Sequence, residues 1–221
     1  HGSDPRLKYH MFKRLNTGGQ TLTNQQLRNC TIRLLDPTFN DFLIEMAGNS
    51  SFQKTMENLS EQNRLGFFDQ ELVLRFYAFL NYRQEYKHDV GDFLTDYMEA
   101  VSDPARPIDF DYENQRAIFE KTFSALSLTL EDKAFAFANP AQTGLVRSFS
   151  VYHFEAITIG IQATLHWLDL TNDHHLDWLK TTLESIKLDK EFISMTTGGG
   201  RNVPTKLRAR IEYVQNKLEE G

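Results

Sequence analysis

The chain has 221 residues, of which 40% are hydrophobic and 12% aromatic, so it can bury one sizeable core or two small ones. A net charge of −6 argues against a protein that binds nucleic acid over its whole surface. No apolar run approaches the roughly 20 residues of a membrane helix. The single cysteine, Cys30, excludes an internal disulfide and favours a reducing compartment, so we expect a cytoplasmic protein.

Basic residues gather toward both ends of the sequence. Residues 1–35 hold six Lys and Arg against one Asp, and residues 201–221 hold five against three Glu, so the middle of the chain is acidic. If the two ends meet in space, they form a local basic patch. The alternative is that these charges belong to two solvated helix faces.

The first predicted element is a helix over about residues 5–15, where apolar residues recur at four-residue spacing. It stops at Asn16, because the adjacent glycines Gly18 and Gly19 adopt positive φ readily and cost a helix too much entropy. A loop is therefore expected from Asn16 to Leu22.

A second helix is predicted over about residues 24–35. Thr23 and Gln26 have the spacing of a capping box, in which each side chain binds the backbone N–H of the other residue. We expect an inner face made of three residues: Leu27, Thr31 and Leu34. Cys30 in this helix is expected to be a small buried apolar residue, not a nucleophile, because no His or Asn near it would activate the thiol.

The strongest helical pattern covers about residues 70–86, with Asp69 as its predicted cap. Apolar residues spread around so much of this helix that it should lie centrally, with other helices packed on several sides. Glu71 and Arg75 stand four residues apart and are expected to pair at the surface. The alternative is that Arg75 reaches toward the loop at Asn16.

Further helices are predicted where a cap or a first-turn proline precedes an apolar pattern. Asp89, Ser150 and either Asn172 or Asp173 are predicted caps. Apart from a turn or short helix over 60–66, the expected helices run from Asp36-Pro37 to about 47, over about 51–59, 90–101, 109–127, 151–165 and 174–187, and from Pro204 onward.

Strand signals are almost absent, so the predicted fold is all-α, an irregular orthogonal bundle of about eight to ten helices. Residues 128–149 are undecided between a short extended piece and a loop, because Phe135 and Phe137 alternate with alanines before a proline and a glycine. The two prolines in 102–108 mark the best linker. They divide the chain into halves 1–101 and 102–221, which we expect to pack as one domain.

Two glycine loops are candidate anion sites. The first has Arg14 and Arg28 on its two sides, and its free backbone N–H groups could cradle a phosphate. The alternative is an αα-corner whose glycines only turn the chain. The second loop holds Gly198, Gly199, Gly200 and Arg201 ahead of another basic helix, with a mobile surface loop as the alternative.

Other polar clusters have simpler interpretations. His174 and His175 are adjacent, so their side chains point about 100° apart on a helix and cannot form a metal-binding pair. His153 and Glu155 lie in an apolar helix and are expected to be hydrogen-bonded in the core, not to act as acid and base. We find no nucleophile with a base, and so predict no catalytic residue and no metal site in this chain.

The residues around the first loop carry a family resemblance. The run F-x-R-L-N-T-G-G-x-x-L-T-x-x-Q-L-R-N, from Phe12 to Asn29, resembles a motif of microbial proteins with a ParB/sulfiredoxin-like domain. That family also supplies the S part of GmrSD-type modification-dependent restriction enzymes. Asp69 to Phe76 and the segment from Thr196 to Gly200 resemble further stretches of it. One departure is Gln26, where the family often has Glu.

The resemblance implies a function in a longer protein. Family members carry an α/β domain with an Asp-Gly-Gln-Gln-Arg signature, which this sequence does not contain. The chain would be the helical portion of a nucleotide- or DNA-acting protein in restriction or anti-phage defence, with its catalytic residues on that missing domain. The expected phosphate-binding residues are Arg14, Asn16, Thr17, Gly18, Gly19, Arg28 and Arg75.

The expected ligands and partners follow from the same resemblance. An NTP with Mg²⁺ would bind to the full-length protein, and no cofactor to this chain alone. The partners would be the missing α/β domain and a nucleotide or DNA, with no membrane. The alternative function is a helical interaction module, in which the near-heptad stripe Leu207, Ile211, Val214 and Leu218 contacts a partner or a second copy of the chain.

Overall fold

The computed structural model describes residues 22–87, 89–103, 108–200 and 202–220. These residues form eleven α-helices, nine of them at least seven residues long, and their only β-type pairing is an isolated bridge between Ala138 and Leu145. The predicted all-α bundle is therefore confirmed. The helix predicted over 5–15 and the loop beginning at Asn16 lie outside the described residues. No described helix is both long and apolar enough to cross a bilayer.

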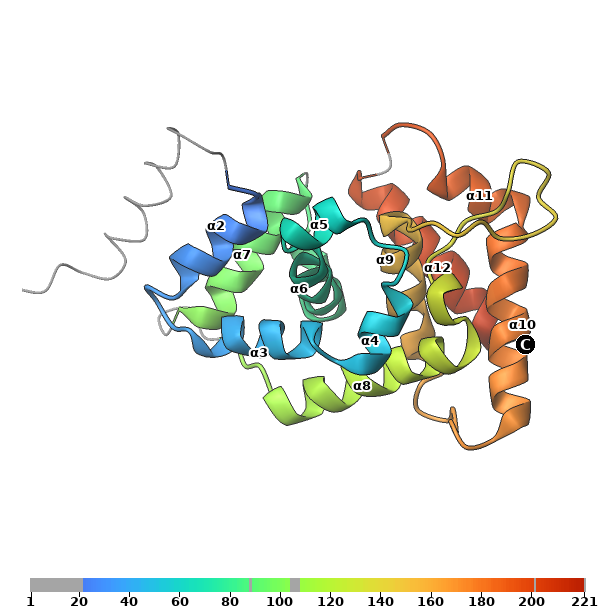
Figure 1. The fold of residues 1–221 in the computed structure, drawn as a ribbon, viewed down its shortest axis with the longest axis horizontal. Coiled ribbons are helices and arrows are strands. Elements are labelled where there is room, and N and C mark those ends of the chain that lie inside the picture. Colours follow the sequence, from blue (N-terminus) through green and yellow to red (C-terminus); the bar gives the residue numbers. More distant parts are fainter. Residues whose placement is uncertain (1–21, 88, 104–107, 201, 221) are drawn as a thin grey trace, which may run out of the picture.

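The helices follow one another with short connections (Figure 1). Their bounds are α2 (Asn24–Ile32), α3 (Thr38–Ala47), α4 (Ser50–Thr55), α5 (Glu61–Leu65), α6 (Phe68–Asn81), α7 (Val90–Ser102), α8 (Tyr112–Thr129), α9 (Val151–Gly160), α10 (Asp173–Leu188), α11 (Lys190–Thr196) and α12 (Pro204–Glu220). Three short 3-10 helices intervene: η1 (Arg83–Glu85), η2 (Glu131–Lys133) and η3 (Ile161–Ala163).

Most of the predicted caps are present. The capping box of Thr23 and Gln26 is formed in both directions, and Asp89, Ser150 and Asn172 each accept a hydrogen bond from the first turn of their helix. Asp69 is not a cap, which corrects the prediction. The helix begins at Phe68, two residues before the predicted start and directly after Phe67 at φ 59°, and Asp69 lies in its first turn, where its charge complements the helix dipole.

Helix α6 lies at the centre of the bundle, as predicted. It is seen almost end-on in Figure 1, with α2, α3 and α7 on one side and α9 on the other. Leu72, Phe76 and Tyr77 on this helix are completely buried. The ring of Phe76 packs edge-on against Phe119 of α8, at a centroid distance of 5.4 Å. Edge-on contacts between aromatic rings therefore link α6 to α8 within the core.

Among the described helices, α9 and α12 pack most extensively against each other. A methyl group added at Gly160 of α9 would stand 2.6 Å from Cγ1 of Val214, so only glycine permits this approach. The predicted stripe on α12, from Leu207 to Leu218, is at most 2% exposed. It is therefore covered by the chain's own core and is not available to a partner.

The two predicted halves share that core. Helix α8 of the second half packs on α4 of the first, and α9 packs on α6. Most of the predicted linker over 102–108 lies outside the described residues. In the undecided segment, Phe135 is buried and Phe137 is 40% exposed. The segment contains both a 3-10 turn and a short paired piece, closed by a 2.9 Å bond from the Val146 N–H to the Phe137 carbonyl.

Candidate functional site

The structure describes only part of the sequence-predicted site. Arg28, Arg75 and the glycines Gly198, Gly199 and Gly200 lie in described segments. The remaining residues lie outside them: Arg14, Asn16, Thr17, Gly18, Gly19 and Arg201. The site as a whole thus stays a prediction. The contacts of Arg28 and Arg75 show how these two residues are held in the fold.

Arg28 points into the protein from α2 and is only 4% exposed. Its guanidinium donates to the Glu71 carboxylate at 2.7 Å, to the Gln25 side chain at 2.9 Å and to the Gly91 carbonyl at 3.3 Å. The inner face of α2 therefore differs from the prediction. Arg28 is buried, whereas Leu27 is only half-buried, because a guanidinium with several acceptors can leave water at a tolerable cost.

A chain of ion pairs continues from Arg28 through the middle of the bundle. Glu71 also accepts from Arg75 at 3.0 Å, and Arg75 donates to one oxygen of Glu155 at 2.6 Å. The other oxygen of Glu155 pairs with Arg210. The expectation that Glu71 and Arg75 pair at the surface is wrong, since their side chains are only 15% and 13% exposed. We call these five side chains, from α2, α6, α9 and α12, the Glu155 network.

The pKa values of Arg75 and Arg28 shift in opposite directions. Burial by itself lowers the pKa of Arg75, but the carboxylates of Glu155 and Glu71 outweigh it and raise that pKa. For Arg28, burial outweighs Glu71 and the pKa is lowered. The network holds three arginines and two glutamates, and the carboxylate of Asp89 lies near Arg28. The guanidinium of Arg210 additionally lies over the ring of Tyr152, 5.1 Å from its centroid.

The two polar residues predicted in α9, His153 and Glu155, have different partners. Glu155 is hydrogen-bonded in the core, as expected, and both of its oxygens accept from arginines. His153 is separate from it and lies 3.3 Å from the Thr196 hydroxyl, through Nε2. Burial lowers the pKa of His153 to about 3, so the imidazole is neutral near pH 7.

A small cavity of about 120 Å³ opens beside Arg28, between α2 and the start of α7. Asp89 and Asp92 contribute carboxylates to its wall. Its volume is below the roughly 300–1,000 Å³ of pockets that enclose small molecules. The described residues alone therefore do not enclose a nucleotide at Arg28.

The second glycine loop turns as its composition predicts. Gly198 and Gly200 have φ values of 87° and 69°, which glycine adopts without strain. The loop is exposed, and just beyond it the Tyr86 hydroxyl donates to the Asn202 carbonyl. The helices that follow the two glycine loops, α2 and α12, are joined to each other through the Glu155 network.

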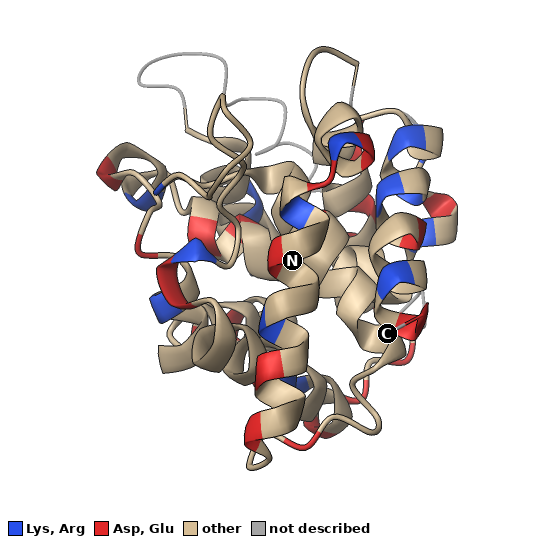
Figure 2. Ribbon diagram, turned by 90° about the vertical axis from the view of Figure 1, so that its right-hand side faces the viewer, with Lys and Arg blue, Asp and Glu red and all other residues tan. Residues whose placement is uncertain are grey.

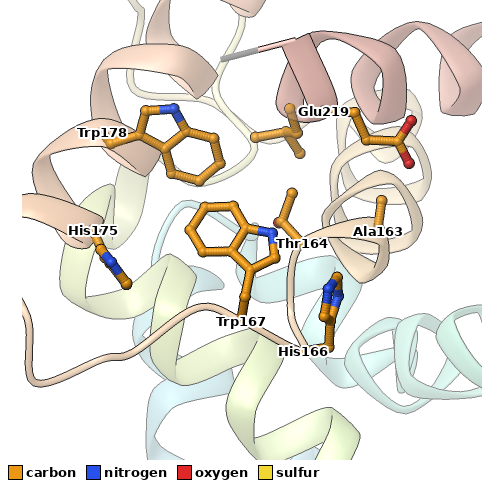
Figure 3. A pocket seen from close by; sticks show the side chains of 8 residues that line it. Ala163, Thr164, His166, Trp167, His175, Trp178 and Glu219 are labelled. Atoms are coloured by element: carbon orange, nitrogen blue, oxygen red, sulfur yellow. The ribbon is translucent and has the colours of Figure 1, made fainter.

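Sequence reasoning missed a larger pocket at α10 and α12, on the side of the molecule opposite α2 (Figure 1), which Figure 3 shows from close by. This pocket has a volume of about 480 Å³ and we call it the tryptophan pocket. Eight residues from the η3 region, α10 and α12 line it: Ala163, Thr164, His166, Trp167, His175, Trp178, Leu218 and Glu219. The signal was present in the sequence, since the chain's two tryptophans stand eleven residues apart on either side of the predicted helix cap.

The aromatic rings of the tryptophan pocket contact one another. The indoles of Trp167 and Trp178 lie 4.9 Å apart at 52°, and the ring of His175 meets Trp167 edge-on at 5.5 Å. The Nδ1 atom of His175 accepts the backbone N–H of Asp169 at 3.1 Å, which places the proton of a neutral imidazole on Nε2. His174 is exposed at the helix start, as expected, but His175 is part of the pocket wall.

Two further predictions concern reactive groups. Cys30 is exposed, which corrects the expectation of a buried thiol: α2 turns Arg28 and Thr31 inward and leaves Cys30 on its outer side. Among the described residues, no three His, Cys, Asp or Glu side chains gather around a position for a metal ion.

Comparison with known proteins finds no match: no family model, no curated protein and no solved structure is similar to this chain. The resemblance carried by the residues around Asn16 thus rests on those motifs alone.

Proposed function

We propose that the chain is the helical part of a cytoplasmic ParB/sulfiredoxin-like protein that acts on nucleotides or DNA in restriction or anti-phage defence. In this proposal, Arg14, Asn16, Thr17, Gly18 and Gly19 form the edge of a phosphate site. The catalytic residues belong to an α/β domain outside this chain.

One observation carries the proposal: the segment that leaves the glycine loop is anchored at three successive points. The Thr23 hydroxyl donates to the Gly66 carbonyl at 2.8 Å, and the Gln26 amide donates to the Leu65 carbonyl at 3.2 Å. Two residues further on, Arg28 enters the Glu155 network. A glycine turn that only reverses the chain needs no such anchoring, whereas a binding loop must be held in place by a rigid scaffold.

Charge supports the proposal in a second way. In the sequence the glycine loop lies between Arg14 and Arg28, and Arg28 lies in the first two turns of the helix after the loop. Figure 2 shows acidic and basic residues interspersed along the helices on the α10 side, so the described part of that face offers no single-sign surface to a nucleic acid. An anionic ligand is therefore assigned to the loop edge and not to this broad face.

Nucleotide titration of the full-length protein, followed by thermal shift, tests the proposal. At a hundred times its dissociation constant, a ligand stabilises the folded state by about 2.7 kcal/mol. We expect NTP with Mg²⁺ to stabilise the full-length protein, and we expect no turnover by this chain alone. Hydrolysis of NTP or cleavage of DNA by the isolated chain would contradict the proposal.

A pair of variants in the full-length protein sharpens the test. Asn16→Ala should lower the activity of the full-length protein, because Asn16 belongs to the proposed edge of the site. Gln20→Ala, in the same loop but outside the proposed site, is the matched control and should keep the activity. Equal activity of both variants and the wild type would overturn the proposal.

A further inference from the structure

The walls of the tryptophan pocket combine aromatic faces with acid. Trp167 is 43% exposed, which is unusual for the largest apolar side chain, and it stands between His175 and His166 (Figure 3). The Glu219 carboxylate lies across the opening from His175, and its Oε1 accepts from the Gln215 amide at 3.2 Å. No Lys or Arg is among the eight lining residues.

We propose that the tryptophan pocket binds a trimethylammonium group, presented by a small molecule or by a methylated lysine side chain. The indoles of Trp167 and Trp178, inclined at 52°, both line the pocket and give it aromatic surface. The faces of aromatic rings attract cations, tryptophan most strongly, and aromatic cages of this kind recognise quaternary ammonium groups. Glu219 adds the opposite charge, which a neutral apolar ligand would not need.

The size and polarity of the pocket agree with this ligand class. The volume of about 480 Å³ lies within the usual range for small-molecule sites. A quaternary ammonium group has no N–H to donate, so it needs few hydrogen-bond acceptors. This matches walls in which Ala163 provides apolar surface and Thr164 donates its hydroxyl to the Ile161 carbonyl.

Tryptophan fluorescence reports binding at this pocket, because both tryptophans of the chain, Trp167 and Trp178, line it. We expect choline to change the emission and to saturate. Its neutral isostere 3,3-dimethylbutanol, which has the same shape without the charge, should bind at least about fivefold more weakly. Equal binding of the two compounds, or no saturable change with choline, would overturn the proposal.

Matched variants separate the two parts of the proposed site. Glu219→Gln should weaken choline binding about threefold and leave binding of the neutral alcohol unchanged. Glu220→Gln is the control, since Glu220 pairs with Lys217 and does not line the pocket. Trp167→Leu should weaken choline binding roughly tenfold, and Trp167→Phe less, with Trp178 still reporting. Circular dichroism confirms that each variant is folded, and unchanged choline affinity in Trp167→Leu would contradict the proposal.

The source of the ammonium group is distinguished by a second pair of probes. A short peptide carrying trimethyllysine is compared with the same peptide carrying unmodified lysine, by calorimetry on the full chain. Tighter binding of the trimethylated peptide than of choline assigns the pocket to a methylated protein, and the reverse assigns it to a small molecule. Equal affinity for both peptides, together with equal affinity for choline and its isostere, would overturn the trimethylammonium assignment.

Discussion

Two buried charged regions of this protein behave differently. In the Glu155 network, each carboxylate accepts hydrogen bonds from two arginines, and the arginines keep their charge. Lys187 on α10 is also completely buried, but its ammonium group donates to a neutral acceptor, the Lys133 carbonyl, at 2.6 Å. Burial lowers the pKa of Lys187 to about 7, which the nearby Glu184 offsets only in part.

The difference shows that burial alone does not decide the charge state, because the partner and the type of side chain also matter. A carboxylate stabilises the protonated form of its neighbour by direct attraction, while a carbonyl stabilises it far less. Arginine, with its high intrinsic pKa, stays charged in either setting, whereas lysine can lose its proton. The network is therefore a set of fixed charges, and Lys187 is a group whose charge depends on pH.

The largest expected effect is that of removing the central carboxylate of the network. Glu155→Gln keeps the size of the side chain but leaves Arg75 and Arg210 without their shared counter-charge. Breaking a buried pair from one side costs about 3–5 kcal/mol of unfolding free energy. Urea denaturation checks this through a lower midpoint at an unchanged slope.

Glu45→Gln is the matched control for that substitution. Glu45 binds Arg116 in a pair whose side chains are 58% and 35% exposed, so solvent screens the attraction. Its loss should cost at most about 1 kcal/mol. A network variant as stable as this surface control would show that the buried charges contribute no net stability.

The pH dependence of stability sharpens the comparison from the side of Lys187. In the unfolded chain Lys187 holds its proton up to its ordinary pKa of 10.5, but in the folded protein it loses the proton near pH 7. Between these values the unfolded state binds more protons, so Lys187 makes stability rise with pH. The rise should approach 1.4 kcal/mol per pH unit within this window.

Lys187→Met should remove that contribution. Methionine has a similar shape and no proton to lose. The unfolding free energy of the variant should therefore depend less on pH between about 7 and 10 than that of the wild type. Chemical denaturation at several pH values gives both curves. Parallel curves for variant and wild type would contradict the assignment of a neutral Lys187.

A smaller and more local effect is expected at the end of the network. Arg28→Lys keeps the charge facing Glu71 but loses the planar guanidinium that also binds Gln25 and the Gly91 carbonyl. We expect a cost of about 1–2 kcal/mol. Hydrogen exchange should show faster exchange in α2 than in the wild type and no change in α10; uniform acceleration throughout the chain would contradict a local role for Arg28.

The sequence predicted local features well, because they depend on neighbouring residues. The capping box at Thr23, the caps at Asp89 and Ser150, and the burial of α6 and α9 all follow from patterns within one or two helical turns. Phe67 at positive φ went unpredicted, since no rule for an aromatic residue favours that conformation.

Features that depend on distant residues could not be predicted in this way. The inward direction of Arg28 is set by Glu71, 43 residues away, and without that partner a surface position is the sensible expectation. The tryptophan pocket also needs the end of α12, far along the chain from its two indoles. Helix α11 is missing from the predicted helices, because it is short and its apolar residues are too few to give a clear periodicity.

Glu155 has a consequence for how the molecule comes apart. It holds Arg75 from 80 residues before it and Arg210 from 55 residues after it, so it joins the N-terminal and C-terminal halves. If either half detached, Arg75 would keep only Glu71 and Glu155 would keep only Arg210, so each would lose one of its two charged partners. We therefore expect heat to melt both halves in a single cooperative transition, with a calorimetric enthalpy equal to the van't Hoff value.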